Sequence, residues 1–241
     1  MARTKRRVNQ LRDISVKRRY TSQAPGSVLF RAGQTVVLCT ASIEESVPHW
    51  MKGSGRGWIT AEYNMLPSST SPRKRRDRGK VDGRTTEIQR LIGRSIRAVA
   101  DLDALGERSI SIDCDVLQAD GGTRTASITG ATIACVDAIH SIRKDLPDPQ
   151  QYPLRDSVAA VSVGVVTGRC FLDLDYELDF AADVDMNVVM TGGKRFVEIQ
   201  GTGEEATFDD EQLQSMLSLA GQGIRQLTKI QKTALGTRWP W

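Results

Sequence analysis

Residues 108–142 constrain the fold most, because a strand pattern, two adjacent glycines and a helix pattern follow one another without a break. Apolar and polar side chains alternate from Ile110 to Val116, which predicts a strand. The sequence ADGGTRT, with Gly121 and Gly122, comes directly after it. A helix rich in Ala and Ile is expected over about 126–142. This junction predicts a helix that begins at the end of a strand and packs on the sheet.

The same order of elements, strands first and then a helix, is expected in each half of the chain. The first half predicts a hairpin around Gly33 and a helix over about 86–102, capped by Thr85 or Thr86. The sequence KDLPDPQQYP predicts the connection between the halves. The second half predicts strands near 157–166, 169–175, 184–190 and 195–200, and an amphipathic helix over about 210–235. These patterns favour an α+β fold, either one compact domain or two merged halves.

Composition excludes several classes of protein. Hydrophobic residues make up 39% and charged residues 26% of the 241 residues, as in ordinary globular proteins. No run approaches the roughly 20 apolar residues that a membrane span needs, so no membrane partner is expected. The four cysteines lie outside any C-x-x-C pair, which favours a reducing, cytoplasmic location. With only two histidines, a histidine-rich metal site is excluded and a Ser-His-Asp mechanism is disfavoured.

The GGTRT stretch predicts a site for a small anion. It matches neither a dinucleotide fingerprint nor a P-loop. A helix start offers unpaired N–H groups, glycines allow close approach, and Arg124 offers a planar fork suited to phosphate oxygens. Arg84 also lies just before a predicted helix and could bind the same anion from the side opposite to Arg124. The alternative is a glycine-rich turn with a threonine cap and two solvated arginines.

An acidic segment predicts a second site, because residues 173–185 hold six carboxylates. On a strand, Asp173, Asp175, Glu177 and Asp179 would share one face. Asp179 and Asp185 flank FAADV and border an apolar strand, so they form the candidate pair. Clusters of carboxylates without His or Cys suit Mg²⁺ or Mn²⁺, and a carboxylate beside a phosphate can act as a general acid. The alternative, for most of the six, is a solvated edge strand.

Residues 72–80, PRKRRDRGK, predict a polyanion-binding loop, because arginines that neutralise phosphates give affinity without sequence preference. Tyr63, upstream, could stack on an unpaired base, although a core aromatic in a strand is the alternative. A phosphate pocket, a carboxylate pair and a basic loop together indicate chemistry on RNA or DNA. The candidate RNA-binding residues are Tyr63, Arg73, Arg75, Arg76 and Arg78.

Long stretches of the chain resemble the ribonuclease PH family, and they extend from about residue 10 to 235. Two positions depart from the family's usual pattern, Ser68 in MLPS and Leu178 in DYELD. The resemblance implies two β-rich βαβ-type units with helices packed on the sheets, in a single domain over 1–241 with halves at about 10–145 and 155–235. The stretches are GSVLFRAGQTVVLCTASIEE, GWITAEYNMLP, DGRTTEIQRLIGRSIRAV, IDCDVLQADGGTRTASITGA, LDLDYELD with DVDMNVVMTG, and FVEIQGTGEEATF.

The resemblance also implies a function. A member would be a phosphorolytic 3′→5′ exoribonuclease, or tRNA nucleotidyltransferase, that trims the 3′ ends of tRNA precursors and other RNA. Inorganic phosphate would be the co-substrate, nucleoside diphosphates the products, and the reverse reaction would add nucleotides. A homo-hexamer built as a trimer of dimers is implied, with Mg²⁺ or Mn²⁺ as the metal. The alternative is a catalytically weak, RNA-binding ring subunit of an exosome-like assembly.

Residue roles carry over by motif. Arg84, Gly122, Thr123 and Arg124 match the family's phosphate-binding positions. Asp179 and Asp185 match its catalytic carboxylates and are the expected metal ligands. The arginine-rich loop would handle RNA at the ring.

Overall fold

Alternating segments in the N-terminal half form a five-stranded sheet, which is antiparallel except for one parallel pair. The computed structural model describes residues 6–76, 82–204 and 206–241. The parallel pair, β4 and β5, is joined through helix α1 and forms a βαβ unit. In sheet order the strands are β1 (Ile14–Arg18), β2 (Gly26–Ala32), β3 (Thr35–Glu44), β5 (Ser109–Gln118) and β4 (Trp58–Met65).

The C-terminal half forms a second sheet of four antiparallel strands. Its central strand β6 is buried along its whole length, as its unbroken apolar sequence predicts. Strands β7 and β8 both pair with β6 and are joined through the short helix α4. The order is β7 (Arg169–Leu172), β6 (Val158–Val166), β8 (Val184–Thr191) and β9 (Phe196–Gly203).

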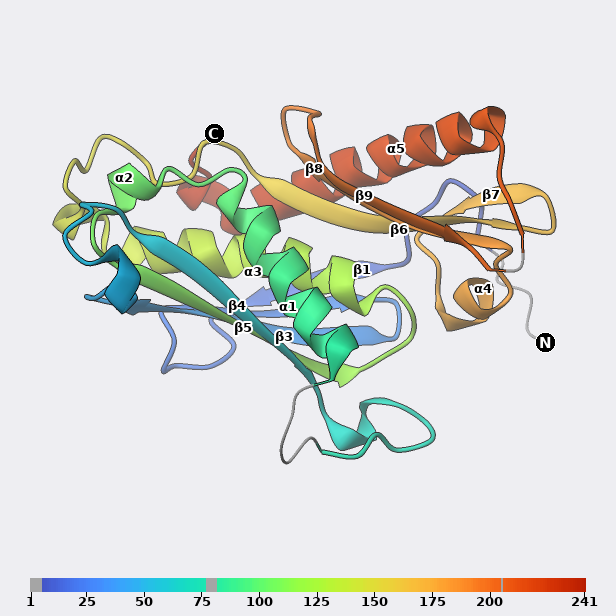
Figure 1. Cartoon of the computed structure of the whole chain (residues 1–241), viewed down its shortest axis with the longest axis horizontal. Helices are drawn as coiled ribbons and strands as arrows, with labels where there is room; N and C mark the ends of the chain where they lie inside the picture. The colour runs from blue at the N-terminus through green and yellow to red at the C-terminus, as the bar shows by residue number, and fades with distance from the viewer. Residues whose placement is uncertain (1–5, 77–81, 205) are drawn as a thin grey trace.

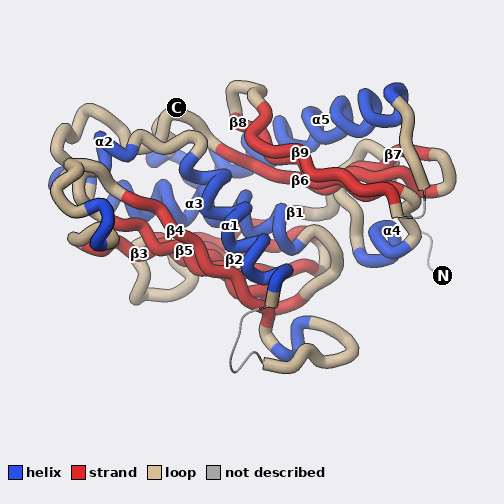
Figure 2. The backbone as a smooth tube through the Cα atoms, in the orientation of Figure 1, coloured by secondary structure: helices blue, strands red, loops and turns tan. Residues whose placement is uncertain are grey.

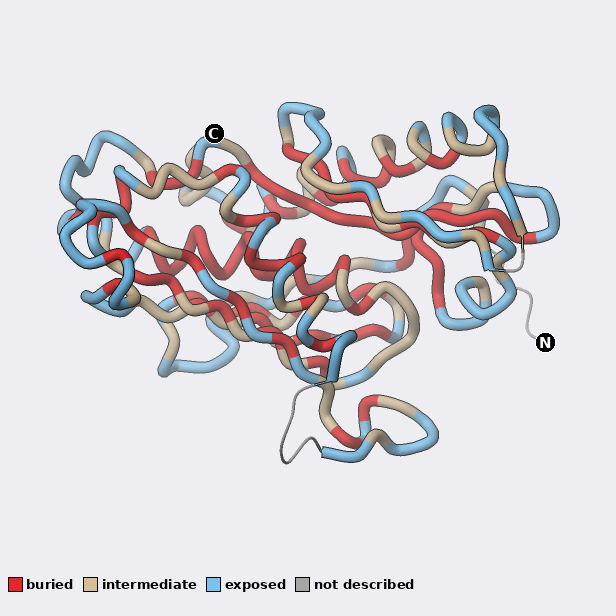
Figure 3. The backbone as a smooth tube through the Cα atoms, viewed as in Figure 1, coloured by how far each residue is buried: buried red, intermediate tan, exposed pale blue. Residues whose placement is uncertain are grey.

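Helix α3 lies between the two sheets and contacts strands of both (Figures 1 and 2). It is buried on almost every side, as Figure 3 shows along its length. Helix α5 packs on β6 and β7 of the second sheet and also contacts α3. No helix in the described parts of the chain is long and apolar enough to cross a membrane. The helices are α1 (Gly83–Arg97), α2 (Leu102–Leu105), α3 (Thr123–Ser141), α4 (Tyr176–Phe180) and α5 (Asp210–Leu235), with 3₁₀ turns at His49–Met51, Pro67–Ser69, Arg143–Asp145 and Gly236–Arg238.

The predicted α+β fold with helices packed on two sheets is confirmed, and the hairpin at Gly33 and the last helix lie where expected. Helix α1 begins earlier than predicted because Asp82, rather than Thr85 or Thr86, accepts the Thr85 amide at 2.6 Å and caps it. The strand predicted over 169–175 is wrong beyond Leu172. Asp173 has a positive φ of 56°, and the chain then turns into α4.

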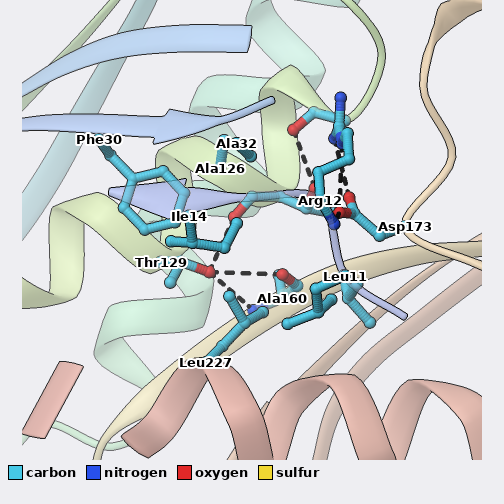
Figure 4. Close-up of a pocket in the computed structure, with 13 residues that line it drawn as sticks. Leu11, Arg12, Ile14, Phe30, Ala32, Ala126, Thr129, Ala160, Asp173 and Leu227 are labelled. Carbon is cyan, nitrogen blue, oxygen red and sulfur yellow. Dashed lines mark hydrogen bonds and ion pairs between the residues drawn. The ribbon is translucent and has the colours of Figure 1, made fainter. Parts of the chain in front are cut away.

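A buried ion pair joins the two halves. Arg12 precedes β1 and Asp173 follows β7, and their side chains are only 7% and 6% exposed. The Arg12 guanidinium donates to Asp173 at 2.8 and 3.1 Å, and the Arg12 amide donates to the same carboxylate at 2.8 Å. Figure 4 shows the two side chains facing each other beside α3, where Thr129 and Ala160 also bond across the halves.

We expect Asp173→Ala to lower the free energy of unfolding by about 3–5 kcal/mol, because it leaves the buried, charged Arg12 without its carboxylate partner. Urea unfolding followed by circular dichroism measures the change. Glu177→Gln is the control, since Glu177 is an exposed carboxylate on the same acidic segment. A loss no larger than that of the control would show that the ion pair does not hold the halves together.

Candidate active site

A cleft of about 720 Å³ opens where the two halves meet. The start of α1, the loop before α3, helix α4, strand β8 and Glu204, which directly follows β9, all contribute to its wall. Every residue predicted for phosphate binding or catalysis lines this cleft. They are Arg84, Gly122, Thr123, Arg124, Asp179 and Asp185.

The glycine loop opens the start of α3 toward this cleft. Gly121 and Gly122 have positive φ angles of 71° and 62°, in the left-handed region where glycine is favoured. A Cβ at Gly121 would lie 2.6 Å from the Leu174 carbonyl oxygen, so close approach also requires glycine. No described side chain caps α3. Its first-turn amides are therefore available to an anion, and Thr123 and Arg124 belong to that turn.

Buried polar groups hold the loop from the core side. The Thr35 hydroxyl donates to the Gly121 carbonyl at 2.7 Å and accepts the Asp120 amide at 2.9 Å. The Arg12 guanidinium donates to the Asp120 carbonyl. The buried Tyr63 and Thr123 hydroxyls bond to each other at 2.9 Å. The backbone that faces the anion is therefore preorganised by bonds behind it.

Arg124 is oriented by two neighbours that sequence reasoning did not identify. Its Nη1 donates to Gln200 Oε1 on β9 at 2.9 Å and lies 3.6 Å from Glu87 Oε1 on α1. Gln200 in turn donates to Glu87 at 2.8 Å. Arg84 lies exposed in the first turn of α1 and lines the same cleft. The cleft thus brings together two arginines from separate helix starts, one of them fixed by this small network.

Asp179 on α4 and Asp185 on β8 come together as predicted, although Asp179 lies on a helix rather than on the expected strand face. The cleft walls displace water and raise the pKa of Asp179 above its usual value. The Asp185 carboxylate raises that pKa further, while Arg124 and Arg84 oppose the shift. Two carboxylates that repel each other in one cleft fit a divalent cation. Among the described residues, no cluster of three His, Cys, Asp or Glu side chains could enclose a metal by itself.

The electrostatic coupling in this pair can be measured directly. We expect Asp185→Asn to lower the pKa of Asp179, because the repelling charge is removed, and Arg124→Ala to raise it, because an attracting charge is removed. Titration of the Asp179 side-chain carbon by NMR measures both shifts. Glu177→Gln is the control. An unchanged pKa in Asp185→Asn would show that the two carboxylates do not sense each other.

Two other parts of the acidic segment differ from expectation. Asp173 and Asp175 were expected to be solvated, yet they are only 5% and 8% exposed. Asp173 pairs with Arg12, and Asp175 caps α4 by accepting the Leu178 amide at 3.0 Å. These roles carry no sequence signal, because the spacing of Asp173 and Asp175 is also that of an exposed strand face.

Tyr63 is not available for base stacking. Its side chain is 2% exposed in the core under the glycine loop, so the prediction of an RNA-stacking ring is wrong for this position and the alternative, a core aromatic, holds. Arg73, Arg75 and Arg76 are exposed on the segment that follows β4 and projects from the end of the first sheet (Figure 1). Thr70 and Ser71, at the start of that segment, line the cleft. Arg78 lies outside the described residues.

Comparison with known proteins agrees with this arrangement. Residues 10–139 match the 3′ exoribonuclease family, domain 1, and residues 156–223 match domain 2. The chain is 64% identical, over 95% of each chain, to the ribonuclease PH of Rhodopirellula baltica. Its fold is similar to rice (Oryza sativa) Rrp46, with a TM-score of 0.78, 18% identity and coverage of 96% of this chain and 98% of that one. It is also similar to a chain of the Archaeoglobus fulgidus exosome with RNA bound to the active site, with a TM-score of 0.77, 22% identity and coverage of 93% and 90%.

The fold and both family matches define a 3′ exoribonuclease. Within that class, the chain belongs to the ribonuclease PH family. Its activity is the phosphorolytic removal of nucleotides from RNA 3′ ends, with inorganic phosphate as a substrate, and it acts in tRNA processing as a tRNA nucleotidyltransferase.

Proposed function

We propose that the α3 start binds the attacking phosphate through Arg84, Arg124 and the backbone of Gly122 and Thr123. The observation that carries this proposal is that these groups share one cleft with the Asp179–Asp185 pair. The two arginines and the backbone N–H groups at the α3 start offset the repulsion between inorganic phosphate and the RNA diester. In this position a phosphate oxygen attacks the terminal phosphorus, the bond to the ribose 3′-oxygen breaks, and a nucleoside diphosphate leaves.

The Asp179–Asp185 pair serves the leaving group. The departing 3′-oxygen must gain a proton, and Asp185 supplies it. The raised pKa of Asp179 lets that carboxyl hold a proton at a higher pH than an isolated aspartate. The same two carboxylates would hold Mg²⁺ or Mn²⁺, which when bound neutralises charge on the reacting phosphates.

A phosphate-dependence assay tests this reading of the cleft. The purified chain is incubated with RNA labelled in its 3′-terminal nucleotide, with and without inorganic phosphate. Release of labelled nucleoside diphosphate only when phosphate is present is the expected result. Release of nucleoside monophosphate would mean hydrolysis, and RNA binding without release would favour the alternative of a catalytically weak ring subunit.

The arginine-rich loop, residues 72–80 of the sequence, binds the RNA backbone at the rim of the cleft. We expect the triple change of Arg73, Arg75 and Arg76 to Gln to weaken RNA binding and to reduce the salt slope by roughly 2, at about 0.7 per phosphate of single-stranded RNA. The turnover rate at saturating RNA stays close to normal, because the reacting groups are intact. Binding measured across a salt series checks this. The matched control changes three exposed lysines elsewhere to Gln, namely Lys52, Lys229 and Lys232.

A control triple with the same loss of slope would mean that net charge, rather than this loop, binds the RNA. Arg78 is assigned to the same loop by its sequence.

The chain assembles as a homo-hexamer, a trimer of dimers, in the cytoplasm. The similar fold of a chain from the Archaeoglobus fulgidus exosome supports an assembly of this kind. Sedimentation analysis of the intact chain tests the stoichiometry.

A further inference from the structure

Helix α4 carries an exposed aromatic pair, and one of the two rings lines the cleft. Tyr176 is 61% exposed and Phe180 82% exposed, although both rings are large and apolar. They occupy the first and last positions of α4, and their rings stack on each other with centroids 6.2 Å apart and planes 25° apart. Of the large apolar side chains that the described residues leave exposed, Tyr176 is the one that lines the cleft.

Helix α4 fixes this pair relative to the reacting groups. Asp179 lies on the same five-residue helix, between the two aromatic rings in sequence. The Tyr176 amide donates to Asp120 Oδ1 at 3.3 Å, so the start of α4 is bonded to the glycine loop. The backbone of Gly121 packs directly against Asp175, which caps α4. A group that stacks on Tyr176 is therefore held at a set distance from the proposed phosphate site at the α3 start and from the Asp179–Asp185 pair.

The charges around the pair favour a base over a phosphate as its partner. Glu177 and Asp179 place carboxylates on the same helix, and these repel the phosphates of RNA. A nucleobase is neutral and has an aromatic face, so it can lie here while the phosphates lie toward Arg84 and Arg124. Stacking of a base on an aromatic side chain is also independent of base identity, which suits an enzyme that shortens many sequences.

We propose that Tyr176, supported by Phe180, stacks on a base at the 3′ end of the RNA and thereby positions the terminal linkage. This role rests on the proposed function, because it requires the RNA 3′ end to enter this cleft. It takes over the base-stacking role that the sequence had assigned to the buried Tyr63. The two aromatic residues position the substrate and take no part in proton transfer.

Short RNAs that lack one base near the 3′ end test the proposal. For the intact enzyme, we expect loss of the stacked base to lower kcat/KM by roughly tenfold to a hundredfold at one position of an abasic series. In the double variant Tyr176→Ala with Phe180→Ala, base-containing and abasic RNAs should react at the same reduced rate. Tyr176→Phe should keep the full effect of the base, because the ring remains. The KM for phosphate should stay unchanged in all three.

The controls separate stacking from a structural role. Phe196→Ala removes a similarly exposed ring, 51% exposed on β9, that does not line the cleft, and it should leave the effect of the base intact. Thermal unfolding and sedimentation of each variant report folding and assembly. If the base keeps its effect in the double variant, the proposal is overturned. The same holds if that variant changes only the association state, since the pair would then be a contact between copies of the chain.

The failure of this proposal can be told apart from a failure of the proposed function. If the enzyme releases nucleoside diphosphate from base-containing RNA but no position of the abasic series affects kcat/KM, stacking is absent and phosphorolysis in the cleft stands. If the KM for phosphate does not depend on Arg124, the assignment of the phosphate site fails independently of the aromatic pair.

Discussion

Asp185→Asn is expected to lower kcat by about 10²–10⁴-fold, the usual contribution of a general acid, while phosphate and RNA still bind. The amide keeps the shape of the carboxylate but cannot deliver a proton to the leaving 3′-oxygen. Single-turnover kinetics at saturating phosphate and RNA measure the chemical step separately from binding. Phosphate affinity, measured by calorimetry, should be equal to or higher than normal, because one negative charge leaves the cleft.

Asp183→Asn is the matched control for that variant. Asp183 lies two residues from Asp185 and does not line the cleft. Its side chain accepts a hydrogen bond from the Thr167 amide at 3.1 Å, and an asparagine side chain can accept the same hydrogen bond. We expect its rate to be close to normal. An Asp185→Asn enzyme with a near-normal rate would place the acid elsewhere in the cleft.

Arg124→Ala is expected to lower kcat/KM for phosphate by about 10²–10³-fold, the usual cost of losing one preorganised donor to a reacting oxyanion. RNA affinity should change little, because the arginine loop is intact. Arg124→Lys should recover only part of the activity, since an ammonium keeps the charge but loses the planar fork. Steady-state kinetics in phosphate and direct RNA-binding measurements distinguish these effects.

Arg94→Ala is the control for the arginine substitutions. Arg94 also lies on a helix and pairs with a β9 carboxylate, that of Glu198 at 3.0 Å, but it does not line the cleft. Removal of Arg124 leaves Glu87 and Gln200 bonded to each other, so no buried charge is left without a partner. Equal losses of RNA binding and phosphorolysis in Arg124→Ala would contradict a role restricted to the small anion.

The sequence predicted most of the cleft because its key residues lie at ends of strongly periodic elements. The glycine loop and the first turn of α3, with Gly121, Gly122 and Arg124, directly follow an alternating strand. Asp185 is the second residue of an apolar strand. Residues whose function depends on long-range contacts could not be predicted in this way. Arg12 meets Asp173 across 161 positions, and Gln200 meets Arg124 across 76.

The acidic segment shows the physical reason for the remaining errors. Its alternating carboxylates fit a strand by periodicity, yet the strand ends at Leu172, Asp173 has a positive φ, and Asp175 caps a helix through a local hydrogen bond. Tyr63 shows a different reason for error, namely that a sequence pattern does not tell which way a strand side chain faces. An aromatic in a strand next to a functional motif has the same sequence pattern whether its ring faces the core or the solvent. The ring of Tyr63 is buried, so it cannot stack on a base. No sequence pattern predicted that Tyr176 would be the exposed aromatic residue in the cleft.

The Arg12–Asp173 pair has a consequence for how the chain can be divided. Although the family comparison separates two domains, the loop in the first half is held by an arginine whose charge is balanced from the second. Helix α3 also presents apolar surface to both sheets, so either half alone would expose a large part of its core. We therefore expect a gene split between the two halves to yield activity by reassociation of the fragments rather than from either fragment alone.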